Sequence, residues 1–151
     1  MKKISVLLVV LCCCFAFAAC GMNSTATKNY TTIAEEFTEK MYDGDYEGAM
    51  VYISDAYDDN LNADALKEIS DGTVKAYGSF VGISGIEQTD MDSYITAMSL
   101  ENYYPSGTDD FIVYYESISF EKGEMGIYFL FDGETREICG ITVCGTEEIV
   151  Q

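Results

Sequence analysis

The residue best suited to acid–base chemistry is Glu116, a carboxylate in the middle of an apolar and aromatic segment. Tyr114 shares its side of the alternating pattern, and Tyr77 and Tyr128 would add hydroxyl groups if the fold brings them near. A carboxyl group enclosed by apolar side chains has a raised pKa and can exchange a proton near neutral pH. The sequence therefore contains a candidate carboxylate–tyrosine pocket made of Tyr77, Tyr114, Glu116 and Tyr128.

The same alternation allows an opposite arrangement, and it is the one we favour. If Phe111, Val113 and Tyr115 face the helices, Glu116 points into water and no such pocket forms. An inward Glu116 favours chemistry, whereas an outward Glu116 favours a binding surface.

A second group of oxygen-bearing side chains could bind calcium. Asp58, Asn60, Asn62 and Asp64 stand at alternate positions, as the first four oxygen ligands of a calcium loop do, but Ala63 stands where the sharp turn needs glycine. Ile69 stands where the loop needs a bidentate glutamate. We therefore interpret the segment as an acidic turn in which Asn62 caps a helix, and we expect no metal and no other cofactor.

Cysteine and histidine usage limits the remaining chemistry. The chain has no histidine, which excludes Ser-His-Asp and Cys-His catalysis and argues against a zinc site. Cys139 and Cys144 lie in one expected strand and should point to opposite faces, roughly 16 Å apart. We interpret both as small buried residues; the alternatives are a disulfide that depends on a bulge, or an intermolecular one.

Chemistry of another kind is expected near the N-terminus. Lys2 and Lys3 precede an apolar stretch at residues 4–19, and small residues then lead directly into Cys20. This arrangement resembles the lipobox of bacterial lipoproteins, which implies that residues 1–19 are removed as a signal peptide and that a diacylglycerol acylates the Cys20 thiol. The alternatives are an uncleaved anchor and a simple secretory signal, although the stretch is shorter than the roughly 20 residues that cross a bilayer.

The charge of the processed chain limits its partners. Removing Lys2 and Lys3 from the 8 basic residues leaves 6 against 26 acidic ones, a net charge of −20. Such a charge argues against nucleic acid and against attraction to anionic lipid, although a cationic partner stays open. We therefore expect a protein at the cell membrane, on its extracytoplasmic face, held by the lipid anchor alone.

The elements that would position these residues begin after a flexible tether at residues 20–29, and one domain follows at residues 30–151. Thr32 and Glu35 have the spacing of a capping box and predict the start of a first helix. A second helix is expected over residues 46–57, and a third helix follows Asn62.

From Gly78 onward the apolar period drops to two, which is typical of strands. Short glycine-containing loops between successive strands indicate an antiparallel sheet. We predict an α+β domain in which three N-terminal helices pack on one face of a curved antiparallel sheet. The expected strands are residues 79–87, 92–101 (an ambiguous segment), 110–121, 125–132 and 137–144.

Several segments resemble the bacterial domain of unknown function 3887. The resemblance covers residues from about 30 to 145 and implies the cone-shaped, cystatin-like fold of nuclear transport factor two-like proteins. That family has no established catalytic residues, so the resemblance transfers none to this chain. The segments that carry it are residues 37–49, 61–66 and 77–83, with 128–132 and 138–141 similar to the last hairpin of the family.

Together these features predict a tethered, non-catalytic accessory module that binds a small molecule in the cone or a protein on the sheet. Tyr103 and Tyr104 are candidates for contact with a partner. One alternative is a small enzyme that pairs Glu116 with Tyr114 or Tyr128. The other is a structural envelope protein that forms a homodimer through an apolar sheet face.

Overall fold

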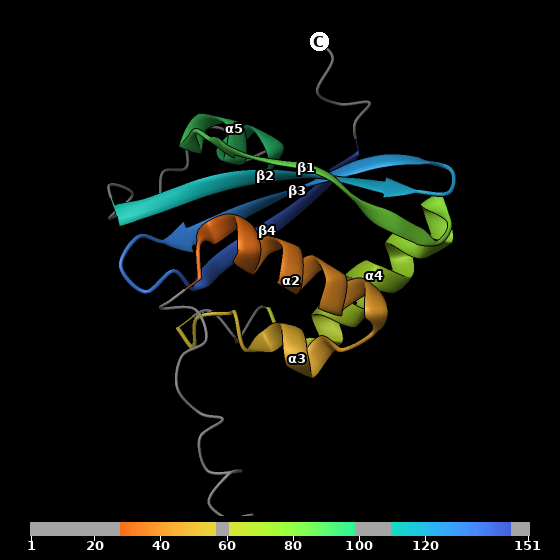
Figure 1. Cartoon of the computed structure of the whole chain (residues 1–151), viewed down its shortest axis with the longest axis horizontal. Coiled ribbons are helices and arrows are strands. Elements are labelled where there is room, and N and C mark those ends of the chain that lie inside the picture. The colour runs from red at the N-terminus through yellow and green to blue at the C-terminus, as the bar shows by residue number, and fades with distance from the viewer. Residues whose placement is uncertain (1–27, 57–60, 99–109, 146–151) are drawn as a thin grey trace, which may run out of the picture.

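Three helices precede an antiparallel sheet and a further helix follows its first strand, so the prediction of an α+β domain with an antiparallel sheet is confirmed (Figure 1). The computed structural model describes residues 28–56, 61–98 and 110–145, and every structural statement below concerns these residues. The elements are α2 (Tyr30–Asp43), α3 (Tyr46–Met50), α4 (Ala63–Tyr77), β1 (Phe80–Thr89), α5 (Met91–Ala97), β2 (Phe111–Phe120), β3 (Gly123–Asp132) and β4 (Ile138–Gly145).

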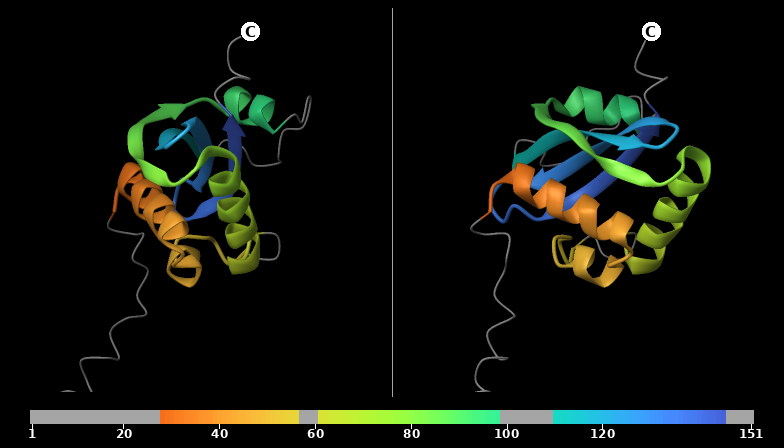
Figure 2. Two further views of the ribbon diagram at one scale, coloured as in Figure 1. Left: turned by 90° about the vertical axis from the view of Figure 1, so that its right-hand side faces the viewer. Right: turned by 45° about the vertical axis from the view of Figure 1, so that its right-hand side comes forward.

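The four strands form one curved sheet in the order β1-β2-β3-β4, and every neighbouring pair is antiparallel. β2 and β3 pair without interruption from Phe111↔Asp132 to Phe120↔Gly123. β1 is irregular, with register shifts between Phe80 and Gly82 and between Ile83 and Gly85. Such bulges bend a strand and increase its twist, which fits the curvature of β1 around the helices in Figure 2.

The main core lies between α2, α3 and α4 on one side and the sheet on the other (Figure 2). Ile33, Phe37 and Met41 recur on one face of α2 and are fully buried. Phe37 meets Phe129 of β3 edge to face, with ring centroids 5.7 Å apart. Each large side chain buried in this way contributes roughly 1.5–3 kcal/mol, so packing against the sheet holds α2 in place.

The start of α2 and the length of α3 differ from the predictions. Asn29, rather than Thr32, caps α2, because its Oδ1 accepts a hydrogen bond from the Thr32 backbone N at 2.8 Å. The second helix was expected to reach residue 57, but α3 ends at Met50. Ile53, which was expected to lie in that helix, pairs with Ile138 instead. The Ile138 backbone N donates to the Tyr52 carbonyl at 2.8 Å, so pairing with β4 replaces further helical turns.

The expected strand at residues 92–101 is wrong, because residues 91–97 form the helix α5. Asp90 caps it through a hydrogen bond from the Ser93 backbone N, at 2.8 Å. Tyr94 and Ile95 are buried against the face of the sheet opposite α2, beside Val113 and Leu130. Both faces of the sheet therefore carry helices, as Figure 2 shows. Among the described residues no helix is long and apolar enough to cross a membrane.

Candidate functional site

Glu116 lies at the centre of the layer between α2 and the sheet, and its side chain is 0 % exposed. Its neighbours on β2, Tyr114 and Ile118, belong to the same helix-facing core. Our interpretation that Glu116 points into water is therefore wrong. The alternate side of β2, which includes Val113, packs on α5 instead. Because α5 buries that second face, apolar residues occur on both sides of β2 and the alternation could not indicate which side faces α2.

The Glu116 carboxyl group has one hydrogen-bond partner and one unpartnered oxygen. The Thr38 hydroxyl of α2 donates to Glu116 Oε2, and Thr38 is itself fully buried. Glu116 Oε1 is buried without a hydrogen bond. Leaving a buried polar atom unpaired costs roughly 1–3 kcal/mol, so this arrangement is one that packing alone does not favour.

Burial raises the pKa of Glu116 to about 7. The hydrogen bond from Thr38 opposes this rise, whereas the negative charges of Glu35 and Glu39 add to it. The desolvated carboxylate is disfavoured because an apolar environment cannot replace its hydration. Glu116 therefore changes its charge near neutral pH.

A surface groove runs between α2 and β1, and Glu116 itself is not among the residues that line it. Thr38, which holds Glu116, lies between Glu35 and Glu39 in α2, and Ile86 is the partner of Glu116 across the pairing of β1 with β2. Glu35 and Glu39 are exposed and one helical turn apart, so they present two carboxylates on one flank of α2. The groove is lined by Glu35, Glu39, Ile83, Ser84, Gly85 and Ile86.

Lys40 of this helix and Lys28, which shortly precedes it, pair with other carboxylates. Lys28 forms an ion pair with Glu36, and Lys40 contacts Asp45 Oδ2 at 2.7 Å. The acidic groove is thus left to Glu35 and Glu39 on the α2 side, with uncharged residues facing them from β1.

The four residues of the predicted pocket do not come together. Tyr114 shares the helix-facing side with Glu116 and stacks on Tyr30, with ring centroids 5.6 Å apart. Tyr77 lies at the end of α4, with its ring 6.2 Å from that of Phe120. Tyr128 lies on the opposite face of the sheet, where it packs beside α5. The sheet therefore separates Tyr128 from Glu116.

Thr38, Glu35 and Glu39 are the members of the site that the sequence analysis missed. Thr38 carries a usable signal, because it is a hydroxyl residue within the apolar stripe formed by Ala34, Phe37 and Met41. A polar side chain within a buried stripe must find a buried partner, and here that partner is Glu116.

The two cysteines lie on the same face of the sheet, not on opposite faces. A register shift in the pairing of β3 with β4 leaves Cys139 as the extra residue, and this bulge reverses the alternation that we had extrapolated. Cys139 is buried and free, and burial raises its pKa to about 11. Cys144 is half-buried, and its thiol donates to the Gly126 carbonyl at 3.7 Å.

Some predicted features fall outside the described residues, namely Cys20, the first positions of the acidic turn at 58–60, and the pair Tyr103 and Tyr104. Asn62 is described and caps α4 as predicted, accepting from the Ala65 backbone N at 3.0 Å. Within the described ranges, no group of three or more acidic or cysteine side chains could hold a metal ion.

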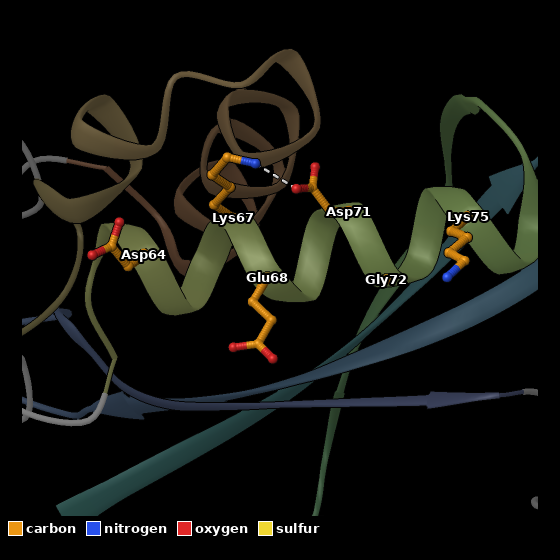
Figure 3. A pocket seen from close by; sticks show the side chains of 6 residues that line it. All are labelled: Asp64, Lys67, Glu68, Asp71, Gly72 and Lys75. Atoms are coloured by element: carbon orange, nitrogen blue, oxygen red, sulfur yellow. Dashed lines mark hydrogen bonds and ion pairs between the residues drawn. The ribbon is translucent and has the colours of Figure 1, made fainter.

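The exposed flank of α4 also has a shallow hollow, drawn in Figure 3. Lys67 forms an ion pair with Asp71 on one side of the helix, whereas Glu68 and Lys75 extend to the other. Charges of both signs that diverge from an exposed helix are typical of a solvated surface, and we assign no site there.

No protein-family model, curated protein or solved structure matches this chain. The resemblance to the domain of unknown function 3887 therefore stays a prediction, and the features that bear on function are the groove and the buried Glu116.

Proposed function

We propose that the protein is an extracytoplasmic lipoprotein whose single domain is a binding module, with the groove between α2 and β1 as its binding site. The observation that carries this proposal is Glu116, which is fully buried with an unpartnered oxygen and lies close enough to Glu35 and Glu39, two exposed carboxylates of the groove, for their charges to act on it. Local arrangements that cost stability, and titratable groups with shifted pKa values, concentrate at functional sites.

The lipobox-like sequence before Cys20 supports a lipid anchor, and the point where the chain joins the domain is well fixed. Arg136 Nη1 donates to the Lys28 carbonyl at 2.9 Å, and the Lys28 ammonium pairs with Glu36. Arg136 has a φ of 62°, a left-handed conformation that side chains other than glycine rarely adopt. The anchor would thus attach at the end of the domain that carries the start of α2 and the β3–β4 turn.

We also propose that the domain has the cone fold of nuclear transport factor two-like proteins, as the resemblance to the domain of unknown function 3887 implies. Supporting this assignment, three helices precede the sheet, and the bulged β1 curves over α2 and α4 (Figure 2). In such a fold the groove beside β1 would lie at the rim of the cone.

A small enzyme is the second candidate, because an inward Glu116 is the arrangement that we expected to favour chemistry, and a carboxyl group with a pKa of about 7 suits acid–base catalysis at neutral pH. Tyr114 could join Glu116, whereas Tyr128 lies across the sheet. Since Glu116 is fully buried, a substrate would reach it only after α2 and β1 separate, and this favours binding over catalysis. A homodimer formed through the outer sheet face is less well supported, because α5 covers part of that face.

The anchor is tested by the intact mass of the protein purified from its native membrane. We expect a species that begins at Cys20 and carries added acyl mass. The Cys20→Ala variant should lose this mass, whereas Cys144→Ala, which removes a cysteine of the folded domain, should retain it. A soluble chain without added mass would overturn the lipoprotein assignment and favour a secreted domain.

A further inference from the structure

We propose that the edge strand β1 is a strap that separates from β2 more readily as Glu116 loses its proton, so that one buried carboxyl group controls access to the layer between α2 and the sheet. The moving part is residues 83–89 of β1. The proposal concerns a motion of the fold and holds whatever the groove binds.

β1 is the least firmly packed strand of the sheet. None of its residues is buried, whereas β2, β3 and β4 each contribute buried residues. It lies at the edge of the sheet, and two register shifts interrupt its pairing with β2. Elements with few buried contacts open at a lower free energy than the whole domain. β1 can therefore separate from β2 while the rest of the domain stays folded.

Both ends of β1 are held, so the strand can open without leaving the domain. At its start, the Phe80 ring stacks on that of Tyr42 in α2, with centroids 5.0 Å apart. At its end α5 follows at once, with Tyr94 and Ile95 buried on the outer face of the sheet. Figure 2 shows β1 curving between the end of α4 and the start of α5. Residues 83–89 thus form a strap between two attachments.

Glu116 couples the motion of this strap to a proton, because β1 lies along one side of it. Ile86 is the partner of Glu116 across the pairing of β1 with β2, and it packs against the main core. While the strap is closed, Glu116 is fully buried and its Oε1 has no hydrogen-bond donor. This environment disfavours the carboxylate, whose hydration it does not replace. Opening of the strap admits water, so the open form favours the carboxylate.

The charged groups that act on Glu116 add to this preference for the neutral form. Glu35 and Glu39 of α2 repel its negative charge and raise its pKa, and only the hydrogen bond from Thr38 opposes the rise. Tyr42 of α2, with a pKa of about 12, stays neutral beside it. The other neighbours, none of them a carboxylate or a cation, are Tyr114 and Ile118 on β2, Ile86 on β1 and Ile127 on β3.

Opening of the strap must therefore depend on pH. In the closed form the pKa of Glu116 is about 7, whereas a hydrated glutamate has the ordinary value of 4.5. Between these values the open form binds one proton fewer than the closed form, so its population rises about tenfold for each pH unit. Below pH 4.5 and above pH 7 both forms hold the same number of protons, and the population is constant.

The test is amide hydrogen exchange of the full mature chain, followed by NMR between pH 4 and pH 9. We expect the exchange of the protected β1 amides, divided by the intrinsic rate at each pH, to rise about tenfold per pH unit from 5 to 7 and then to level off. Low concentrations of urea should leave this exchange unchanged. The amides of β3 should respond to urea, because they exchange through global unfolding, which exposes far more surface.

Glu116→Gln should show no rise, because the group that titrates is gone. Should that variant not fold, the double variant Glu35→Gln/Glu39→Gln at exposed positions tests the same point. Removing the two repelling charges lowers the pKa of Glu116, so the rise should level off at a lower pH. The matched control, Asp64→Asn/Glu68→Gln, removes the same charge at the same spacing from the exposed flank of α4 and should follow the wild type.

Two results would overturn the proposal. If the β1 and β3 amides exchange with the same opening free energy and the same urea dependence, β1 opens only when the whole domain unfolds. If β1 opens locally but its exchange does not change with pH, or if Glu116→Gln keeps the rise, Glu116 does not control the strap.

Discussion

At the scale of single residues, the environment of Glu116 shows what a sequence pattern can and cannot reveal. A carboxylate among alternating apolar residues was a clear signal, and it identified a residue with an unusual environment. The direction of its side chain did not follow from the pattern, because the neighbouring β3 residues 125–131 are all buried, on both faces of the sheet. The decisive contact comes from Thr38, which is 78 residues away along the chain.

The Glu116→Gln variant should be more stable than the wild type above pH 7 and about equally stable near pH 4. The folded-state pKa of about 7 lies above the ordinary value of 4.5, so the native protein holds a proton that the unfolded chain releases between these values. The wild type therefore loses stability as pH rises from 4.5 to 7, by roughly 3 kcal/mol if the full shift is realised. Glutamine cannot ionise and avoids this loss.

Urea unfolding of both proteins between pH 4 and pH 8 measures the difference. Glu68→Gln on the exposed flank of α4 is the control. The difference in the free energy of unfolding between this variant and the wild type should change little over this range. If the difference in the free energy of unfolding between Glu116→Gln and the wild type stays constant over this pH range, the raised pKa of Glu116 is contradicted.

At the scale of elements, periodicity predicted the long segments, made the short helix α3 too long and assigned the short helix α5 to a strand. The period of 3.6 located α2 and α4, and the period of two located β2, β3 and β4 to within about two residues at each end. α5 was mistaken for a strand because one buried turn, with Tyr94 next to Ile95, is too short to establish a period. The bulge at Cys139 likewise changes which face a residue occupies without any local signal.

Substitutions at Asn29 and at Thr32 distinguish the observed cap of α2 from the predicted one. Asn29→Ala should destabilise the protein by about 1 kcal/mol, because its side chain satisfies the Thr32 backbone N–H. Thr32→Ala should cost much less, since the Thr32 side chain is not the cap. Chemical denaturation of the two variants gives both values, and a larger cost for Thr32→Ala would restore the capping-box prediction.

At the scale of the whole molecule, the acidic composition is the dominant feature, and it follows directly from the sequence. Asp and Glu outnumber Lys and Arg by 26 to 8 in the full chain. Three ion pairs are formed among the described residues, and each of them is at least partly exposed to solvent. Most of the negative charge therefore meets no compensating cation within the domain, and its self-repulsion opposes the compact state.

Salt should consequently stabilise the protein. Raising NaCl from 0.05 to 0.5 M shortens the range of charge repulsion and should raise the thermal unfolding midpoint by several degrees. Scanning calorimetry at several salt concentrations, with sucrose as an uncharged control for solvent effects, measures this change. A midpoint that falls with salt would show that the ion pairs, rather than the excess negative charge, dominate the electrostatics.

The contact between Arg136 and Lys28 has a mechanical consequence. If a lipid at Cys20 holds the chain, any pull from the membrane arrives at Lys28, whose carbonyl accepts from Arg136 and whose ammonium pairs with Glu36. The force is thereby shared between the β3–β4 turn and the first turns of α2. Glu39 lies beyond this point in the chain, so the groove that it lines would be shielded from a pull on the anchor.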